Sequence, residues 1–171
     1  MKAFKTYPLI IVFTLLTCSL FAQKGKSDNN INQMISLYFD MKNALVNNDG
    51  TTVKIKANKL YHILATDPGK GLDRDQMLFL ADHLEDLMNN CQQMCYTIDR
   101  IEQRPYFARL TKTLYDLVKG LKINTTTIYM QYSPANNAYW MSETMAIKNP
   151  YNPYKEWSTD GKTTEILAAN K

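Results

Sequence analysis

The feature that most constrains the fold of this chain is a helical repeat of apolar residues, which returns four times between residues 31 and 122. In each segment the apolar side chains stand three or four residues apart, the spacing that places them along one side of an α-helix. Such helices are stabilised mainly by packing their apolar sides together. The pattern predicts four helices, over residues 31–48, 52–65, 73–101 and 105–122, in an up-down bundle.

Capping and helix-breaking residues support these boundaries. Thr51 or Thr52 can cap the second helix, and Asp73 can cap the third. Pro105 lacks an amide hydrogen and disfavours helical angles in the residue before it, so we expect it in the first turn of a new helix. The third segment has the longest apolar stripe, formed by Met77, Ala81, Leu84, Met88, Cys91, Cys95 and Ile98.

The segment after Lys122 has a different character. Residues 125–132 are β-branched and aromatic, which is typical of a short strand. Five of the eleven tyrosines and both tryptophans lie between Tyr129 and Trp157, more aromatic area than a solvated tail carries. We therefore predict an all-α domain whose residues 123–171 form an irregular, aromatic-rich cap containing a short strand or hairpin.

The N-terminus has the composition of an export signal. A positive start is followed by an apolar core too short to span a bilayer, and residues 1–22 end in Ala22, a small residue suited to cleavage. A lipoprotein site at Cys18 is less favoured, because Thr17 stands where a smaller residue is usual. The sequence predicts a periplasmic or secreted protein with a polar linker over residues 23–30 and a single helical domain over residues 31–171.

Charge and cysteine content exclude several classes. Without its first 22 residues the chain has 18 basic and 16 acidic residues, a net charge of +2, so nothing indicates a nucleic-acid surface. No second apolar stretch approaches membrane-spanning length, so we expect no membrane span after signal cleavage. Only Cys91 and Cys95 remain after cleavage, too few for a disulfide scaffold.

Several short segments resemble those of a known family, in the same order and over nearly all of the exported chain. They are YFDMKNALVNND at residues 38–49, Gln103-Arg104 followed by Phe107, YMQYSP at residues 129–134, WMS at residues 140–142 and IKNPY at residues 147–151. The chain thus resembles the bacterial exported domain of unknown function 3347. That family occurs alone or appended to periplasmic adaptor proteins of copper and silver efflux pumps, which implies a link to metal handling.

The chain departs from the family where metal chemistry would matter most. Typical members resemble Cys-Pro-Met where this chain has Ser133-Pro134-Ala135, and they carry a further Met and a Cys-Gly pair where this chain runs from Lys155 to Gly161. Thiolate and thioether sulfurs are the donors that select Cu(I). The family's presumed metal site therefore does not carry over to any residue of this chain.

The remaining soft donors are Cys91, Met94 and Cys95, which project from one side of the third helix. They are candidate ligands for Cu(I) or Ag(I). Packing is the favoured interpretation, because both cysteines follow the apolar stripe and free cysteine is commonly buried. A disulfide across one helical turn would be strained. His62 and His83 stand alone beside helix stripes, without a ligand motif.

Two further groups are candidates for binding or structural roles. The first group is aromatic and consists of Tyr139, Trp140, Tyr151, Tyr154 and Trp157. These residues could form an aromatic platform for a ligand. The favoured interpretation is that they pack the cap onto the bundle. Structural roles are expected for Gln103, Arg104, Pro105, Asn149 and Pro150. Arg104 is expected to donate to free carbonyl groups at the end of the third helix, and the tandem of residues 149–154 to form rigid turns.

The sequence does not indicate an enzyme, because it has no Gly-x-Ser-x-Gly motif, no phosphate loop and only two histidines as potential bases. We therefore predict a non-enzymatic exported binding or structural module of a heavy-metal-associated family, without a cofactor and without the usual metal site. Its partner would be a protein or peptide, with metal-efflux components as candidates. The alternative is a periplasmic copper- or silver-binding protein that uses Cys91, Met94 and Cys95.

Overall fold

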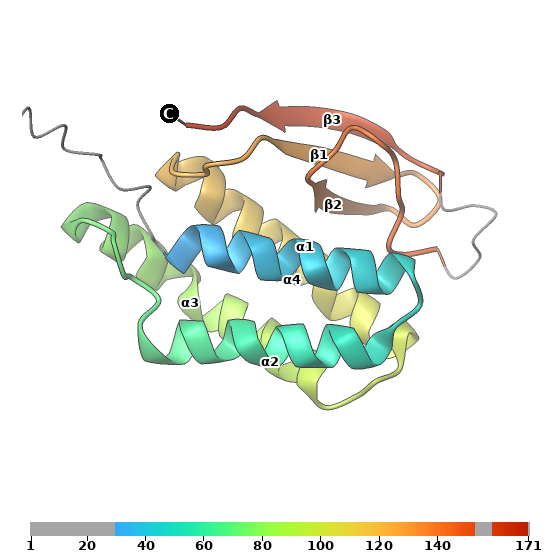
Figure 1. Ribbon diagram of the computed structural model, residues 1–171, viewed down its shortest axis with the longest axis horizontal. Coiled ribbons are helices and arrows are strands. Elements are labelled where there is room, and N and C mark those ends of the chain that lie inside the picture. Colours follow the sequence, from blue (N-terminus) through green and yellow to red (C-terminus); the bar gives the residue numbers. More distant parts are fainter. Residues whose placement is uncertain (1–29, 153–158, 171) are drawn as a thin grey trace, which may run out of the picture.

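The computed structural model describes residues 30–152 and 159–170, which form four helices and three strands (Figure 1). The elements are α1 (Asn30–Val46), α2 (Gly50–Thr66), α3 (Arg74–Cys95), α4 (Arg100–Leu121), β1 (Ile128–Ser133), β2 (Ala138–Ser142) and β3 (Lys162–Leu167). Four helices were predicted and are confirmed. The predicted signal segment, Tyr154 and Trp157 lie outside the described residues.

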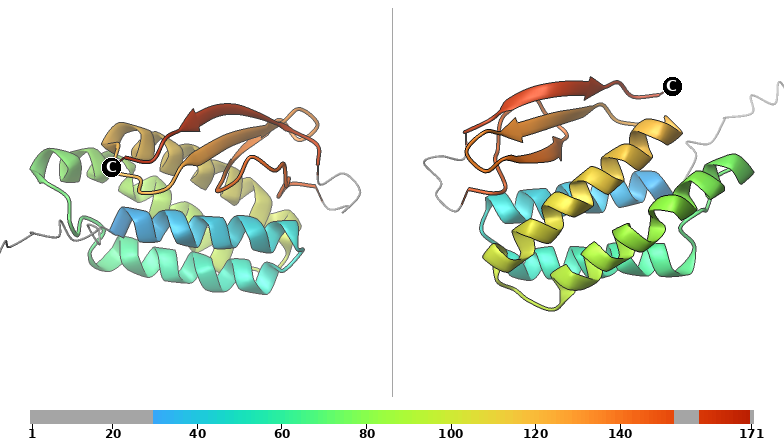
Figure 2. Two further views of the ribbon diagram at one scale, coloured as in Figure 1. Left: turned by 45° about the horizontal axis from the view of Figure 1, so that its top comes forward. Right: turned by 180° about the vertical axis from the view of Figure 1, so that it is seen from behind.

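The three strands form an antiparallel sheet in the order β2-β1-β3. The sheet lies over α1 and α4, and α2 and α3 lie on the opposite side of those two helices (Figures 1 and 2). The short strand or hairpin predicted within the cap is thus part of a three-stranded sheet, and the all-α class is only partly supported. Only β1 overlaps a predicted strand, and β3 was missed because its alternation of exposed and half-buried residues is weakly apolar.

The junction between α3 and α4 differs from the prediction. α3 ends at Cys95 rather than at residue 101, and α4 begins at Arg100, where the Asp99 side chain accepts the amide hydrogen of Ile101. Pro105 consequently lies in the second turn of α4 instead of the first. The ring of a proline at this depth removes one backbone hydrogen bond to the exposed Ile101, which the helix tolerates.

Helix α2 begins with a backbone contact that only glycine allows. The Asp49 side chain caps the helix by accepting from the amide of Thr52, so neither Thr51 nor Thr52 is the cap. Gly50 is buried against the loop between α3 and α4, and a Cβ at this position would lie 1.9 Å from the carbonyl oxygen of Ile98. Glycine is needed here for close approach.

The core of α3 uses a different stripe from the predicted one. Leu80, Leu87, Cys91 and Met94 are buried, whereas the predicted core residues Met77 and Ile98 are 47% and 61% exposed. Ala81, Leu84 and Met88 instead line a shallow groove between α2 and α3, together with Tyr61. The helix therefore carries two neighbouring apolar stripes: one is fully buried, and Leu84 and Met88 of the other are only partly buried against the same core. None of the described helices is long and apolar enough to cross a membrane.

Candidate functional site

The predicted metal ligands lie at the packed end of α3. Cys91 and Met94 are 0% exposed, and Cys95 is half-buried with its Sγ 3.9 Å from the carbonyl oxygen of Lys54. Burial, followed by the proximity of Cys95, raises the pKa of the Cys91 thiol, and burial also raises the pKa of Cys95. Because the thiolate is the metal ligand, these shifts oppose metal binding near neutral pH.

No His, Asp, Glu or further Cys ligand joins the two thiols in the part of the chain that the structure describes. That part contains no group of three or more His, Cys, Asp or Glu residues arranged to hold a metal ion. His62 is exposed on α2, where its ring lies against Tyr61. The Nδ1 of His83 lies 2.8 Å from the carbonyl oxygen of Phe79 on its own helix. The structure therefore brings neither histidine to the thiols as a third ligand.

The predicted aromatic platform is divided between the core and the surface. Trp140 is 0% exposed and Tyr151 is 7% exposed, with the Tyr151 ring between Trp140 and Phe107. The Tyr151 hydroxyl donates to the carbonyl of Tyr139 at 2.6 Å. Among the three members of the platform that the structure describes, Tyr139 alone is exposed, at 49%. Trp140 and Tyr151 thus pack the chain after β2 onto α4 and are not available as a surface.

Arg104 has a different partner from the expected one. Its Nε donates to the carbonyl of Pro150 at 3.0 Å, and its Nη2 donates to Asn152 O and Asn48 Oδ1, both at 3.4 Å. The guanidinium therefore joins the segment at residues 150–152, which follows β2, to the loop between α1 and α2. The free carbonyls near the end of α3 are bound by Gln103, whose Nε2 donates to Thr97 O at 2.9 Å and to Met94 O at 3.4 Å. The same Nε2 also donates to Gly50 O, at the start of α2, at 3.0 Å.

The hairpin between β1 and β2 carries a polar cluster that sequence reasoning missed, which we call the hairpin cluster: Ser133, Asn136, Asn149 and Asp160. The Ser133 hydroxyl donates to Asp160 Oδ2 at 2.6 Å. Asn149 Nδ2 donates to Asn136 Oδ1 at 3.0 Å and to the Asp160 carbonyl at 3.2 Å. The cluster joins the hairpin to the start of β3, although its members are up to 27 residues apart in sequence.

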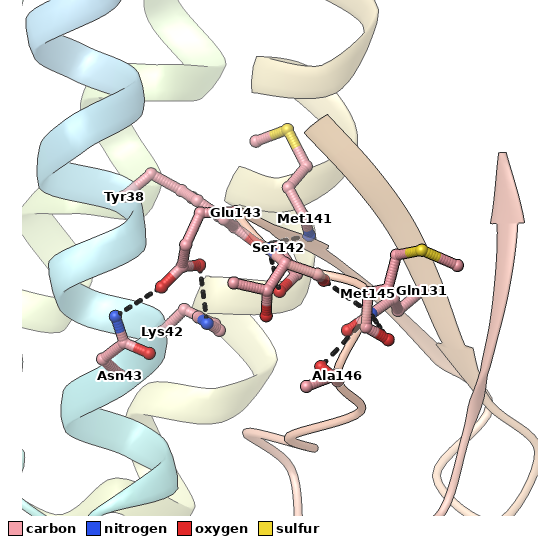
Figure 3. Close-up of polar contacts among 10 residues, drawn as sticks. Tyr38, Lys42, Asn43, Gln131, Met141, Ser142, Glu143, Met145 and Ala146 are labelled. Atoms are coloured by element: carbon pink, nitrogen blue, oxygen red, sulfur yellow. Dashed lines mark hydrogen bonds and ion pairs between the residues drawn. The ribbon is translucent and has the colours of Figure 1, made fainter. Parts of the chain in front are cut away.

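A second missed arrangement connects the sheet to the helices (Figure 3). The Met141 amide donates to the Tyr38 hydroxyl at 3.0 Å, and that hydroxyl lies 2.7 Å from Thr111 Oγ1. Thr111 in turn donates to the carbonyl of Phe107, so Tyr38 donates to Thr111. Burial raises the pKa of Tyr38 well above its ordinary value. One hydrogen-bonded chain therefore runs from β2 through α1 to α4.

Beside this chain lies an ion pair with a buried ammonium group (Figure 3). Lys42 is 1% exposed, and its Nζ lies 2.8 Å from Glu143 Oε2. Asn43 donates to the other carboxylate oxygen at 2.9 Å. Burial lowers the pKa of Lys42, and for Glu143 the hydrogen bonds from Lys42 and Asn43 outweigh burial and lower its pKa. The pair anchors the residue after β2 to α1.

A glutamine amide shapes the loop that follows this ion pair. Gln131 is fully buried, and its Nε2 lies within 3.4 Å of three consecutive carbonyl oxygens, those of Thr144, Met145 and Ala146 (Figure 3). The carbonyls of an irregular loop need such donors because no ladder satisfies them. The buried polar residues of this region therefore have a structural role, since their donors bind loop carbonyl groups.

Comparison with known proteins identifies a family. The family described as "Protein of unknown function (DUF3347)" matches residues 34–126, which are 93 of the 171 residues. The chain belongs to this family. The match runs from α1 to the residues just before β1, so it covers the helices and not the sheet. No curated protein and no solved structure matches the chain.

Proposed function

We propose that this member of the family is a non-enzymatic exported module with a binding or structural role, and that it lacks the metal site of a heavy-metal-associated family. On this proposal the protein acts in the periplasm or outside the cell. Its partner is a protein or peptide, and the components of a metal-efflux system are the first candidates.

The observation that carries the proposal is the hydrogen bond between Ser133 and Asp160. The resemblance described above implies a cysteine where Ser133 stands and a Cys-Gly pair within residues 155–161, which here end in Asp160-Gly161. The Ser133 hydroxyl and the Asp160 carboxylate are 2.6 Å apart, so the ends of the two segments that carry the family's motifs are adjacent in space. A hydroxyl and a carboxylate that bond to each other are hard oxygen donors and poor ligands for a soft monovalent ion.

The thiols of α3 give little support to a substitute site. Cys91 and Met94 are completely buried, and the pKa of both thiols is raised, so forming thiolates there would be unfavourable. Their neighbours on the core side of α3 are apolar, including Leu87. The alternative, a copper- or silver-binding protein that uses Cys91, Met94 and Cys95, would require α3 to separate from its packing.

The test is an anaerobic Cu(I) titration of the exported protein against a chromophoric chelator. We expect negligible uptake by the wild type, and no difference from a Cys91→Ser, Cys95→Ser double variant. Uptake of one equivalent by the wild type that is lost in the double variant would establish the copper-binding alternative instead.

A gain-of-function variant tests the role assigned to the hairpin cluster. We expect Ser133→Cys combined with Asp160→Cys to take up Cu(I) under reducing conditions, because the two sulfurs would replace oxygens that are in contact. A Ser133→Ala, Asp160→Ala variant is the matched control, since it removes the same hydrogen bond without adding thiols. If the cysteine variant takes up no more Cu(I) than this control, the cluster does not mark a lost metal site.

A further inference from the structure

The second apolar stripe of α3 lies in the layer of the molecule that is farthest from the sheet (Figures 1 and 2). Met77 and Leu78 begin this stripe, and they are 47% and 61% exposed. Ala81, Leu84 and Met88 continue it along the groove of about 630 Å³ that α3 forms with α2. We call these five residues the outer stripe. Because exposed apolar side chains that run along a helix commonly mark a contact with another protein, the outer stripe is a candidate contact surface.

The side of the groove that α2 forms is also partly apolar. Tyr61 lines the groove from α2, and Ile55 of the same helix is 49% exposed. The groove further contains Glu85, Asn89 and Gln92 of α3, so its lining is both apolar and polar. Protein–protein interfaces combine apolar groups with polar and charged ones, whereas pockets for small molecules are lined mainly by apolar side chains. The composition of this face therefore fits a protein partner.

The two helices that form this face carry opposite charges. α2 contains three lysines and no acidic residue, whereas α3 contains four acidic residues and one arginine. One of the lysines is paired with α1. The other two, Lys54 and Lys59, are exposed on α2, and Asp82 and Glu85 are exposed on α3. None of these four residues forms an ion pair with another described residue, so their charges are available to a partner.

A second copy of the chain is the partner that matches this charge pattern. A two-fold axis that runs along the groove brings α2 of each copy over α3 of the other. The basic helix of one copy then faces the acidic helix of the other on both sides of the axis, and the two outer stripes meet between them. A partner of a single sign would be attracted by one helix of this face and repelled by the other.

We propose that the face formed by α2 and α3 is the interface of a symmetric dimer of this chain. The two outer stripes pack against each other, and Lys54 and Lys59 of each copy face Asp82 and Glu85 of the other. The apolar contact supplies affinity, and the charges fix the orientation of the two copies. The sheet and the hairpin cluster lie on the opposite side of the molecule and stay free, so the dimer and the proposed loss of the metal site can each fail without the other.

The first experiment is sedimentation velocity of the exported protein over a range of concentrations. A reductant is present, so that the half-buried Cys95 cannot link two copies through a disulfide. We expect a concentration-dependent shift to twice the mass of the chain. Leu78→Ser should weaken the dimer about tenfold or more, because it removes an exposed part of the outer stripe. Ile101→Ser is the matched control, since Ile101 is a similarly exposed apolar residue on α4, outside this face.

The second experiment reverses the charges at exposed positions, where folding is little affected. Lys54→Glu combined with Lys59→Glu makes both helices acidic, and Asp82→Lys combined with Glu85→Lys makes both basic, so each variant alone should be monomeric at low salt. An equimolar mixture of the two variants should dimerise again, because every acidic helix then faces a basic one. A wild type that is monomeric at every concentration, equal weakening by Leu78→Ser and Ile101→Ser, or a mixture that associates no better than its components would overturn the proposal.

Discussion

The helical region and the C-terminal sheet region share one apolar core, but they differ in how much they also depend on buried polar side chains. The helices bury a continuous apolar core, in which most buried residues are aliphatic, Met or aromatic. The sheet region adds Trp140 and Met141 to this core, and its irregular segments are fixed in addition by buried polar side chains that bind their carbonyl groups, including those of Gln131, Asn149 and Arg104. Apolar packing depends on area and volume, whereas a buried hydrogen bond depends on one partner at one place. Single substitutions should therefore act differently in the two regions.

The largest loss of stability is expected from a substitution in the helical region, at Gly50. We expect Gly50→Ala to lower the free energy of unfolding by about 3 kcal/mol or more, because the added Cβ would meet backbone at 1.9 Å, which cannot move alone. Gly120→Ala is the control, since its Cβ would meet the ring of Phe79, a side chain at the surface that can rotate. Chemical denaturation measures both variants, and equal losses would contradict the close backbone approach.

An intermediate effect is expected at the contact between the two regions. Glu143→Gln removes the partner of the buried Lys42 ammonium and should cost about 1–2 kcal/mol, less than a fully buried pair because Glu143 is partly exposed. Lys42→Met combined with Glu143→Gln removes both charges and should recover most of that loss. Urea denaturation of the single and double variants measures the difference. A double variant less stable than Glu143→Gln would show that the ion pair is not the reason for the loss.

The smallest effect concerns the tyrosines that join the regions, and it depends on pH. Burial raises the pKa of Tyr38 and Tyr151, so the folded protein keeps these protons at pH values where the unfolded chain has lost them. Their contribution to the free energy of unfolding is therefore complete below about pH 10 and decreases as the pH rises above it.

The variant Tyr151→Phe tests two contributions of the Tyr151 hydroxyl to stability: its hydrogen bond, measured at neutral pH, and its titration, measured at alkaline pH. It loses the hydrogen bond to Tyr139 and should cost about 1 kcal/mol at neutral pH. Above pH 10 its stability should fall less steeply than that of the wild type, because one buried hydroxyl no longer titrates. Thermal denaturation between pH 7 and 11 compares the two proteins. Parallel pH profiles would mean that Tyr151 does not contribute to the alkaline loss.

The sequence predicted the helices well because their signals are local. Apolar spacing along α1, α2 and α4 gave the buried residues, and Asp73 was recognised as the cap of α3, where it forms a capping box with Gln76. The α3 stripe was assigned correctly at Cys91 and wrongly at Met77 and Ile98, because two apolar stripes lie side by side on that helix. Leu80, Leu87 and Met94 are buried because the neighbouring helices pack against that side of α3. The apolar spacing alone does not indicate which side this is.

The candidate sites were harder to predict, because they depend on residues far apart in sequence. The sequence by itself determined that Cys91 follows an apolar stripe, and the structure buries it. The Tyr38 hydroxyl, by contrast, meets Thr111 and Met141, which are 73 and 103 residues away. No local sequence pattern predicts contacts between residues so far apart in the chain. Sequence alone therefore determined the helices through repeated local burial, whereas the sheet and the hairpin cluster were decided by tertiary packing.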